Sequence, residues 1–134
     1  MRHGFICFSA LAAIFLFACK KTPDPVIQPD NTPKLEGGKG GNFDRAFFSV
    51  LNGKGVSSRM FLKYAADKMP SDTTLYDERG NTITEPGFGP HFHFEDLKKG
   101  TYFLHIKSAT AQADTTFFLT DSSAEDMDIK INLR

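Results

Sequence analysis

The sequence predicts an all-β protein, a single antiparallel β-sandwich of about seven short strands. Three observations predict it: apolar residues recur at every second position, turn residues separate short apolar runs, and no long stretch carries a helical stripe. The clearest alternation is Met127–Leu133, in which every second side chain is apolar. Because successive side chains of a strand point to opposite faces, this period indicates a strand with one buried face.

The other strands are identified by the same alternation and by the turn residues between them. Residues 102–107 read Tyr-Phe-Leu-His-Ile-Lys, and residues 91–95 read His-Phe-His-Phe-Glu. In chain order the predicted strands are Phe43–Leu51, Arg59–Tyr64, Thr73–Tyr76, Thr82–Glu85, His91–Glu95, Tyr102–Lys107, Thr115–Thr120 and Met127–Leu133. Turn signals separate them at residues 52–55, 77–81, 86–87 and 98–100, each containing glycine.

The first residues have the pattern of an export signal. Arg2 precedes the uncharged apolar run Phe5–Ala18, which is shorter than the roughly 20 residues needed to cross a membrane. The following Leu-Phe-Ala-Cys at residues 16–19 resembles the lipobox of bacterial lipoproteins, although Phe17 is bulkier than the usual occupant. The resemblance implies that Cys19 is lipidated and becomes the first residue of the mature chain.

An ordinary secretion signal with an incidental cysteine is the alternative. Cys7 lies inside the leader, so cleavage leaves Cys19 as the single thiol, and lipidation accounts for it. No internal disulfide is then possible. Lys20 is not the aspartate that retains lipoproteins in the inner membrane, so the resemblance implies the outer membrane. The absence of an acidic cluster after Cys19 favours the periplasmic face over the cell surface without deciding between them.

The composition divides the 134 residues into three parts. Residues 1–18 are the predicted signal peptide, and residues 19–41 are a lipidated, proline- and glycine-rich tether that we expect to be extended and flexible. Residues 42–134 are the predicted sandwich domain.

Residues 92–104 carry a family resemblance. Their aromatic pair, Leu97, the loop ending in Gly100 and the following Tyr102 resemble the central hairpin of transthyretin-like sandwiches, including carboxypeptidase regulatory-like and Cna-B-like domains. Residues 60–77 are similar to those of small Gram-negative lipoproteins with the same sandwich. The resemblance implies this fold and no particular activity, since such domains serve as stabilising additions to enzymes, adhesin stalks or binding modules.

Three histidines follow the leader, and they form the candidate site. His91 and His93 share one strand face, and a hairpin would pair His105 on the next strand with one of them. Three imidazoles that converge on one patch suit zinc or copper. The simpler alternative is that all three are the polar members of a solvent-facing alternation.

Aromatic residues on the polar side of the alternation are a second feature. Phe61 and Phe103 fall there, and the pairs at residues 47–48 and 117–118 cannot both point inward. These rings either form a partner surface, or they reflect a sheet edge covered by a loop or simply imperfect alternation, and the second interpretation is favoured.

Charge and motifs exclude several functions. The formal net charge is +0, without a basic stripe, so we expect no nucleic-acid partner. There is no G-x-S-x-G nucleophile motif, and we expect no catalytic residues. The predicted function is a non-enzymatic binding or structural module of the envelope, anchored to the membrane by its lipid and contacting an envelope protein, a glycan or a small ligand. The alternative is a metal-binding protein that uses His91, His93 and His105.

Overall fold

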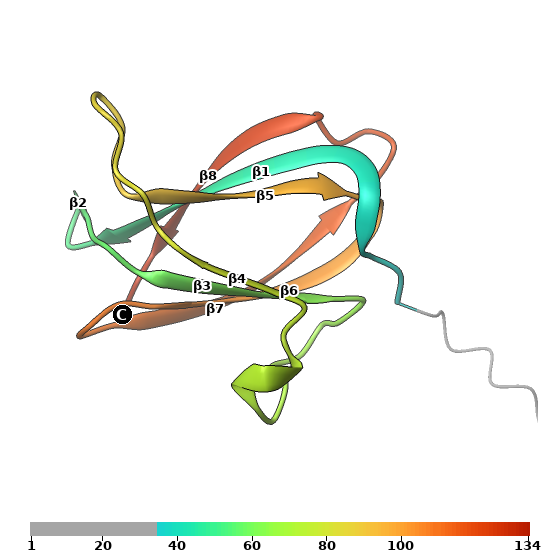
Figure 1. Cartoon of the computed structure of the whole chain (residues 1–134), viewed down its shortest axis with the longest axis horizontal. Coiled ribbons are helices and arrows are strands. Elements are labelled where there is room, and N and C mark those ends of the chain that lie inside the picture. Colours follow the sequence, from blue (N-terminus) through green and yellow to red (C-terminus); the bar gives the residue numbers. More distant parts are fainter. Residues whose placement is uncertain (1–34) are drawn as a thin grey trace, which may run out of the picture. The chain divides into compact units, whose positions relative to one another are not determined.

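The computed structural model describes residues 35–134, so the predicted signal peptide, Cys19 and most of the tether lie outside the described residues. The described part consists of two β-sheets that face each other across a common core (Figure 1). No helix in this part is long and apolar enough to span a membrane. The predicted all-β sandwich is confirmed.

The sandwich contains eight strands and one short 3-10 helix. They are β1 (Lys39–Leu51), β2 (Lys54–Gly55), β3 (Arg59–Tyr64), η1 (Thr73–Leu75), β4 (Glu78–Asn81), β5 (His91–Leu97), β6 (Gly100–Lys107), β7 (Gln112–Leu119) and β8 (Asp126–Asn132).

We call the sheet of β8, β1, β5 and β2 sheet A, and the sheet ordered β4-β3-β6-β7 sheet B. All neighbours are antiparallel except β8, which pairs with β1 in parallel. Strand β1 therefore lies in the middle of sheet A, hydrogen-bonded to β5 on one side and to β8 on the other.

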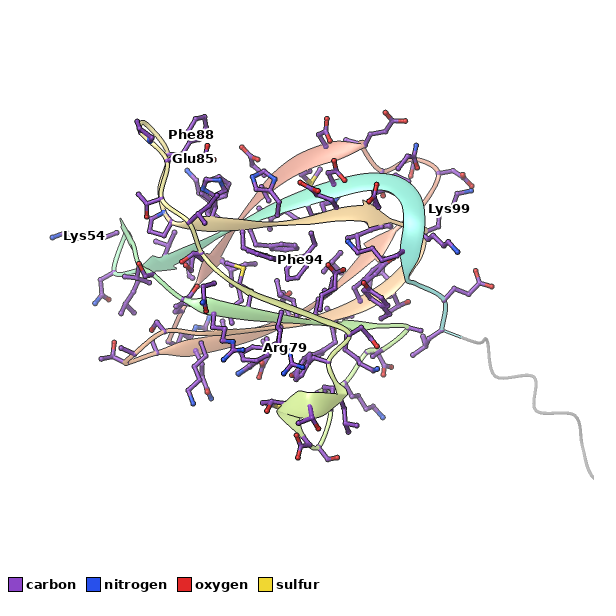
Figure 2. All side chains as sticks on the ribbon, in the orientation of Figure 1. Lys54, Arg79, Glu85, Phe88, Phe94 and Lys99 are labelled. Atoms are coloured by element: carbon purple, nitrogen blue, oxygen red, sulfur yellow. The ribbon has the colours of Figure 1, made fainter. Side chains whose placement is uncertain are left out.

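The core lies between the two sheets and follows the period of two. Phe47 and Phe94 of sheet A face Tyr102 and Leu104 of sheet B, and all four side chains are fully buried. Figure 2 shows Phe94 between the two sheets. The rings of Phe47 and Phe94 pack edge to face, and Phe117 stacks on Tyr102 and is tilted against Phe47, an arrangement that adds to the hydrophobic stabilisation.

The domain begins earlier than the sequence predicted. Strand β1 starts at Lys39, and Glu36 accepts a hydrogen bond from the amide of Thr101. Gly100 has φ 141°, and a Cβ added there would lie 1.9 Å from the carbonyl oxygen of Glu36. At Gly41, which was assigned to the tether, an added Cβ would lie 2.0 Å from the carbonyl oxygen of Leu97, so this glycine belongs to the fold because two backbones approach closely there.

Two predicted strands are wrong. Thr73–Tyr76 contains β-branched residues, but η1 forms there because the Asp72 side chain accepts a hydrogen bond from the amide of Thr74 at 2.7 Å. Thr82–Glu85 is not a strand of either sheet, since the chain crosses there from β4 to β5 and only Ile83 forms a bridge, to His91.

The predicted pairing of residues 91–97 with the following strand is also wrong. Strand β5 pairs with β1 in sheet A, whereas β6 lies between β3 and β7 in sheet B. Both edges of β6 are therefore filled without β5. The connection at Lys98–Lys99 crosses from one sheet to the other, so the apolar faces of the two strands meet across the core.

Candidate functional site

The outer face of sheet A carries the candidate site. Alternation along β1 turns Phe47 into the core and Phe48 outward. In the register, Phe48 lies between His91 of β5 and Lys130 of β8, and Ala46 lies between His93 and Asp128. Three neighbouring strands thus place aromatic, imidazole and charged side chains on one surface.

Two histidines meet on this face. The His91 ring stacks on Phe48, with ring centroids 4.8 Å apart and an interplanar angle of 23°. Its Nδ1 donates to the carbonyl of Gly89 at 2.8 Å, and only 3% of the residue is exposed. The His93 ring lies 5.0 Å from that of His91 and is exposed to solvent. His91 thus packs between Phe48 and Phe88, and His93 is an exposed surface group.

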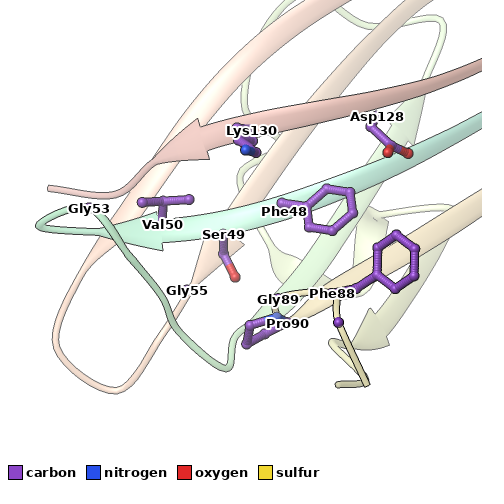
Figure 3. A pocket seen from close by; sticks show the side chains of 11 residues that line it. Phe48, Ser49, Val50, Gly53, Gly55, Phe88, Gly89, Pro90, Asp128 and Lys130 are labelled. Carbon is purple, nitrogen blue, oxygen red and sulfur yellow. The ribbon is translucent and has the colours of Figure 1, made fainter. Parts of the chain in front are cut away.

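An open groove lies beside this cluster (Figure 3). Its volume is about 400 Å³; Phe88 forms an aromatic wall on the side of the loop before β5, Asp128 and Lys130 form a polar wall on the side of β8, and Phe48 lies between the two. Phe88 is 57% exposed at the end of the loop between β4 and β5 (Figure 2). We call these four residues the groove residues.

Glycines shape the end of the groove. Gly55 lies so close to Pro90 that an added Cβ would approach the proline Cδ to 2.6 Å. Gly87, immediately before Phe88, has φ 84°, a left-handed conformation that glycine adopts without strain. Gly55 therefore allows the β1–β2 hairpin to lie against the end of the loop that carries Phe88.

A smaller hollow of about 210 Å³ continues along the same face. Ala46 and His93 contribute to its lining together with Asp44, Asp126 and Asp128, so Asp128 borders both hollows. Strand β8 carries Asp126 to this place, and the turn before β8 is fixed by the buried Arg45, which donates to the carbonyls of Ala124 and Glu125. Burial lowers the pKa of the Arg45 guanidinium, and the charges of Asp126 and Asp44 oppose this shift.

The third histidine lies elsewhere. His105 is on the outer face of sheet B, where its Nδ1 donates to Asp114 Oδ1 at 2.6 Å. Its ring lies 5.6 Å from that of Phe61 and 6.3 Å from that of Tyr76. The predicted convergence with His91 and His93 is wrong because β5 and β6 belong to different sheets. Within residues 35–134, no group of three or more metal-ligating side chains comes together.

Two aromatic residues on the polar side of sheet B, Phe61 and Phe103, are covered by another segment, which agrees with the favoured interpretation. Tyr76, from the segment between β3 and β4, packs on Phe61 and Phe103 to form a second small core. Its hydroxyl is buried and, among the described residues, lacks a hydrogen-bond partner. Phe118 on the same face remains 64% exposed.

Sequence reasoning missed three groove residues. The alternation of β8 already placed Asp128 and Lys130 on the outward side, but nothing in it related them to Phe48. Phe88 stands alone in the turn sequence Pro-Gly-Phe-Gly-Pro at residues 86–90, and a large ring among turn residues is a signal that could have identified it.

Comparison with known proteins adds no assignment to this geometry: no family model matches the chain, and no curated protein matches it significantly.

Proposed function

We propose that the chain is a lipid-anchored protein of the bacterial envelope whose sandwich domain is a non-enzymatic binding module. The groove on the outer face of sheet A is its binding surface. The single observation that carries this proposal is the groove itself, in which the half-buried Phe48 lies between the exposed ring of Phe88 and the charged pair of Asp128 and Lys130. Open grooves that combine aromatic rings with a few polar groups are typical ligand sites.

The arrangement of the histidines supports binding over catalysis. Within residues 35–134, no serine or threonine hydroxyl is hydrogen-bonded to His91, His93 or His105. His105 is directed to Asp114 under the cover of Tyr76, and His91 is held by Gly89 and Phe48. A metal site of all three histidines is not part of this proposal because the two sheets separate them.

The anchor part of the proposal rests on Cys19 and the lipobox resemblance, with Lys20 favouring the outer membrane. Growth with radioactive palmitate should label the chain, and Cys19→Ser should abolish the label and move the protein from the membrane fraction to the soluble one. Cys7→Ser is the matched control and should change neither result. Labelling that survives Cys19→Ser would contradict the anchor.

The binding surface can be tested before its ligand is known. With Cys7 in the removed leader and Cys19 lipidated, an introduced cysteine is the only free thiol. Val50 lines the groove and Thr116 lies on the outer face of sheet B, and both are partly buried. The variants Val50→Cys and Thr116→Cys are therefore a matched pair.

We expect maleimide to modify Val50→Cys at least about threefold more slowly in permeabilised cells than in purified protein, because a bound partner excludes the reagent. Thr116→Cys should react at similar rates in both. Equal rates for Val50→Cys in the two preparations would show that the groove is empty in the envelope and would refute the proposal.

A further inference from the structure

The two walls of the groove differ in chemistry, and this difference points to a class of ligand. We infer that the groove binds an oligosaccharide, with a sugar ring against Phe88 and over Phe48 and its hydroxyls bonded to Asp128 and Lys130. The inference rests on the proposed function and names the ligand of that same site.

The aromatic wall is available to a flat apolar surface, because the Phe88 ring is 57% exposed. The half-buried Phe48 ring stacks on His91 and lies beside Lys130 of β8 in the register. Phe48 therefore forms the apolar floor between Phe88 and the side of the groove where Figure 3 shows Asp128 and Lys130. A pyranose ring has an apolar C–H face and a perimeter of hydroxyls, so it can contact both walls at once.

The polar wall offers both hydrogen-bond roles. Within residues 35–134, neither Asp128 nor Lys130 forms an ion pair or a side-chain hydrogen bond. An ionised carboxylate only accepts and an ammonium only donates, whereas a sugar hydroxyl does both. A neutral polyol therefore satisfies both side chains, whereas a ligand with a single charge is repelled by the side chain of the same charge.

The backbone of β1 is closed to an added strand. Over Asp44–Phe48, strand β1 is hydrogen-bonded to β5 on one edge and to β8 on the other. An extended peptide that lies over β1 thus finds no free backbone donors or acceptors on this strand. A saccharide needs none, because its polar groups lie on its own perimeter.

The site is longer than one sugar ring. Asp128 borders both the groove and the smaller hollow beside His93, and the outward residues from Asp126 to Lys130 span about 13 Å at the usual rise of a strand. We therefore expect an oligosaccharide to bind more tightly than its monosaccharide.

The test uses the full lipidated chain in a detergent without a sugar headgroup, with ligand-observed NMR titrations. The probes are maltotriose, cellotriose and chitotriose, their monosaccharides, and trialanine. We expect at least one trisaccharide to bind saturably below about 10 mM and at least about threefold more tightly than its monosaccharide. Phe88→Ala and Asp128→Asn should each weaken this binding about tenfold, while Phe118→Ala, a matched loss of an exposed ring from sheet B, should leave it unchanged.

Each other outcome overturns the inference in a distinct way. No saturable trisaccharide binding at about 10 mM refutes the ligand class. Saccharide binding that is unchanged in Phe88→Ala and Asp128→Asn refutes the site. If trialanine binds in a Phe88-dependent manner and no saccharide does, the saccharide inference fails while the proposed binding surface stands. Thermal unfolding of each variant shows whether the substitution left the domain folded.

Discussion

The outer faces of the two sheets carry similar side chains, but one face is covered by another segment of the chain and the other is open. On sheet B, Phe61 and Phe103 are covered by Tyr76 from the segment between β3 and β4, and His105 is buried beside them, bonded to Asp114. On sheet A, Phe48 is half-buried against His91, and Phe88 remains exposed. Outward aromatic residues therefore have two uses in this protein: one set forms a second small core, and the other leaves an open groove.

The difference follows from the length of the connections. The segment between β3 and β4 is long enough to fold back over sheet B, and η1 gives it a compact turn (Figure 1). The loop between β4 and β5 instead extends beside sheet A, with Gly87 and Gly89 on either side of Phe88. We therefore expect substitutions on sheet B to change stability and substitutions on sheet A to change binding.

The largest expected effect is on the covered face. Phe61→Ala should lower the free energy of unfolding by about 3–5 kcal/mol, because it removes a ring from a closed cluster and leaves a cavity under Tyr76. Urea denaturation of the full chain in detergent measures this change. A loss below about 1 kcal/mol would show that the segment carrying Tyr76 does not hold the face closed.

The second-largest expected effect is a fall in the free energy of unfolding at alkaline pH. Burial raises the pKa of Tyr76 and Tyr102, and it raises that of Tyr64 together with the hydrogen bond to Glu78. Unfolded tyrosines ionise near pH 10 whereas these folded ones stay protonated. Stability should thus be constant below about pH 9 and fall above pH 10, by up to about 1.4 kcal/mol per pH unit for each tyrosine.

The Tyr76→Phe variant tests how much of this alkaline loss belongs to the covered face. Urea midpoints measured from pH 7 to 11 should show a shallower alkaline slope than in the wild type. An unchanged slope would mean that Tyr76 ionises in the folded state.

A matched pair of hydroxyl deletions gives the third effect. Tyr76→Phe should leave stability at pH 7 unchanged or raise it by about 1 kcal/mol, since the buried hydroxyl has no partner among the described residues. Tyr102→Phe should lower it by about 1 kcal/mol, because that hydroxyl accepts from the amide of Gly38 and donates to the carbonyl of Lys98 at 2.7 Å. Equal losses in the two variants would show that Tyr76 is hydrogen-bonded in solution.

The smallest effect on stability belongs to the open face. Phe88→Ala should change the free energy of unfolding by less than about 0.5 kcal/mol, because the ring is largely in solvent and belongs to neither core cluster. Chemical denaturation beside Phe61→Ala measures the contrast. A loss of several kcal/mol would mean that Phe88 stabilises the fold, and the outer face of sheet A would then resemble that of sheet B in its role.

Local pattern was sufficient to identify most of the strands. Arg59–Tyr64 was predicted with its observed bounds, and the alternation of β8 correctly turned Ile129 and Ile131 inward and Lys130 outward. The prediction was wrong at Thr73–Tyr76, where the threonines suggested a strand but the Asp72 side chain stabilises a turn. Lipidation of Cys19 stays a prediction, since that residue lies outside the described part.

Local pattern was insufficient for the site because a strand's alternation does not specify its neighbours. His91, His93 and His105 all lie on outward faces as predicted, but the crossing at Lys98–Lys99 places them on opposite sides of the sandwich. The groove has the same origin: Phe48, Phe88 and Lys130 are far apart in the sequence and meet only through the pairing of β1 with β8 and the path of the loop before β5.

The apolar period of the sequence was enough to predict an all-β sandwich and the side of β3, β5, β6 and β8 that faces the core, because both depend on local alternation. The tertiary structure was needed to show which strands are neighbours, which histidines meet, and which aromatic face is covered. Those outcomes depend on contacts between distant segments, on the filled edges of β6, and on whether a connection folds back over its own sheet or away from it.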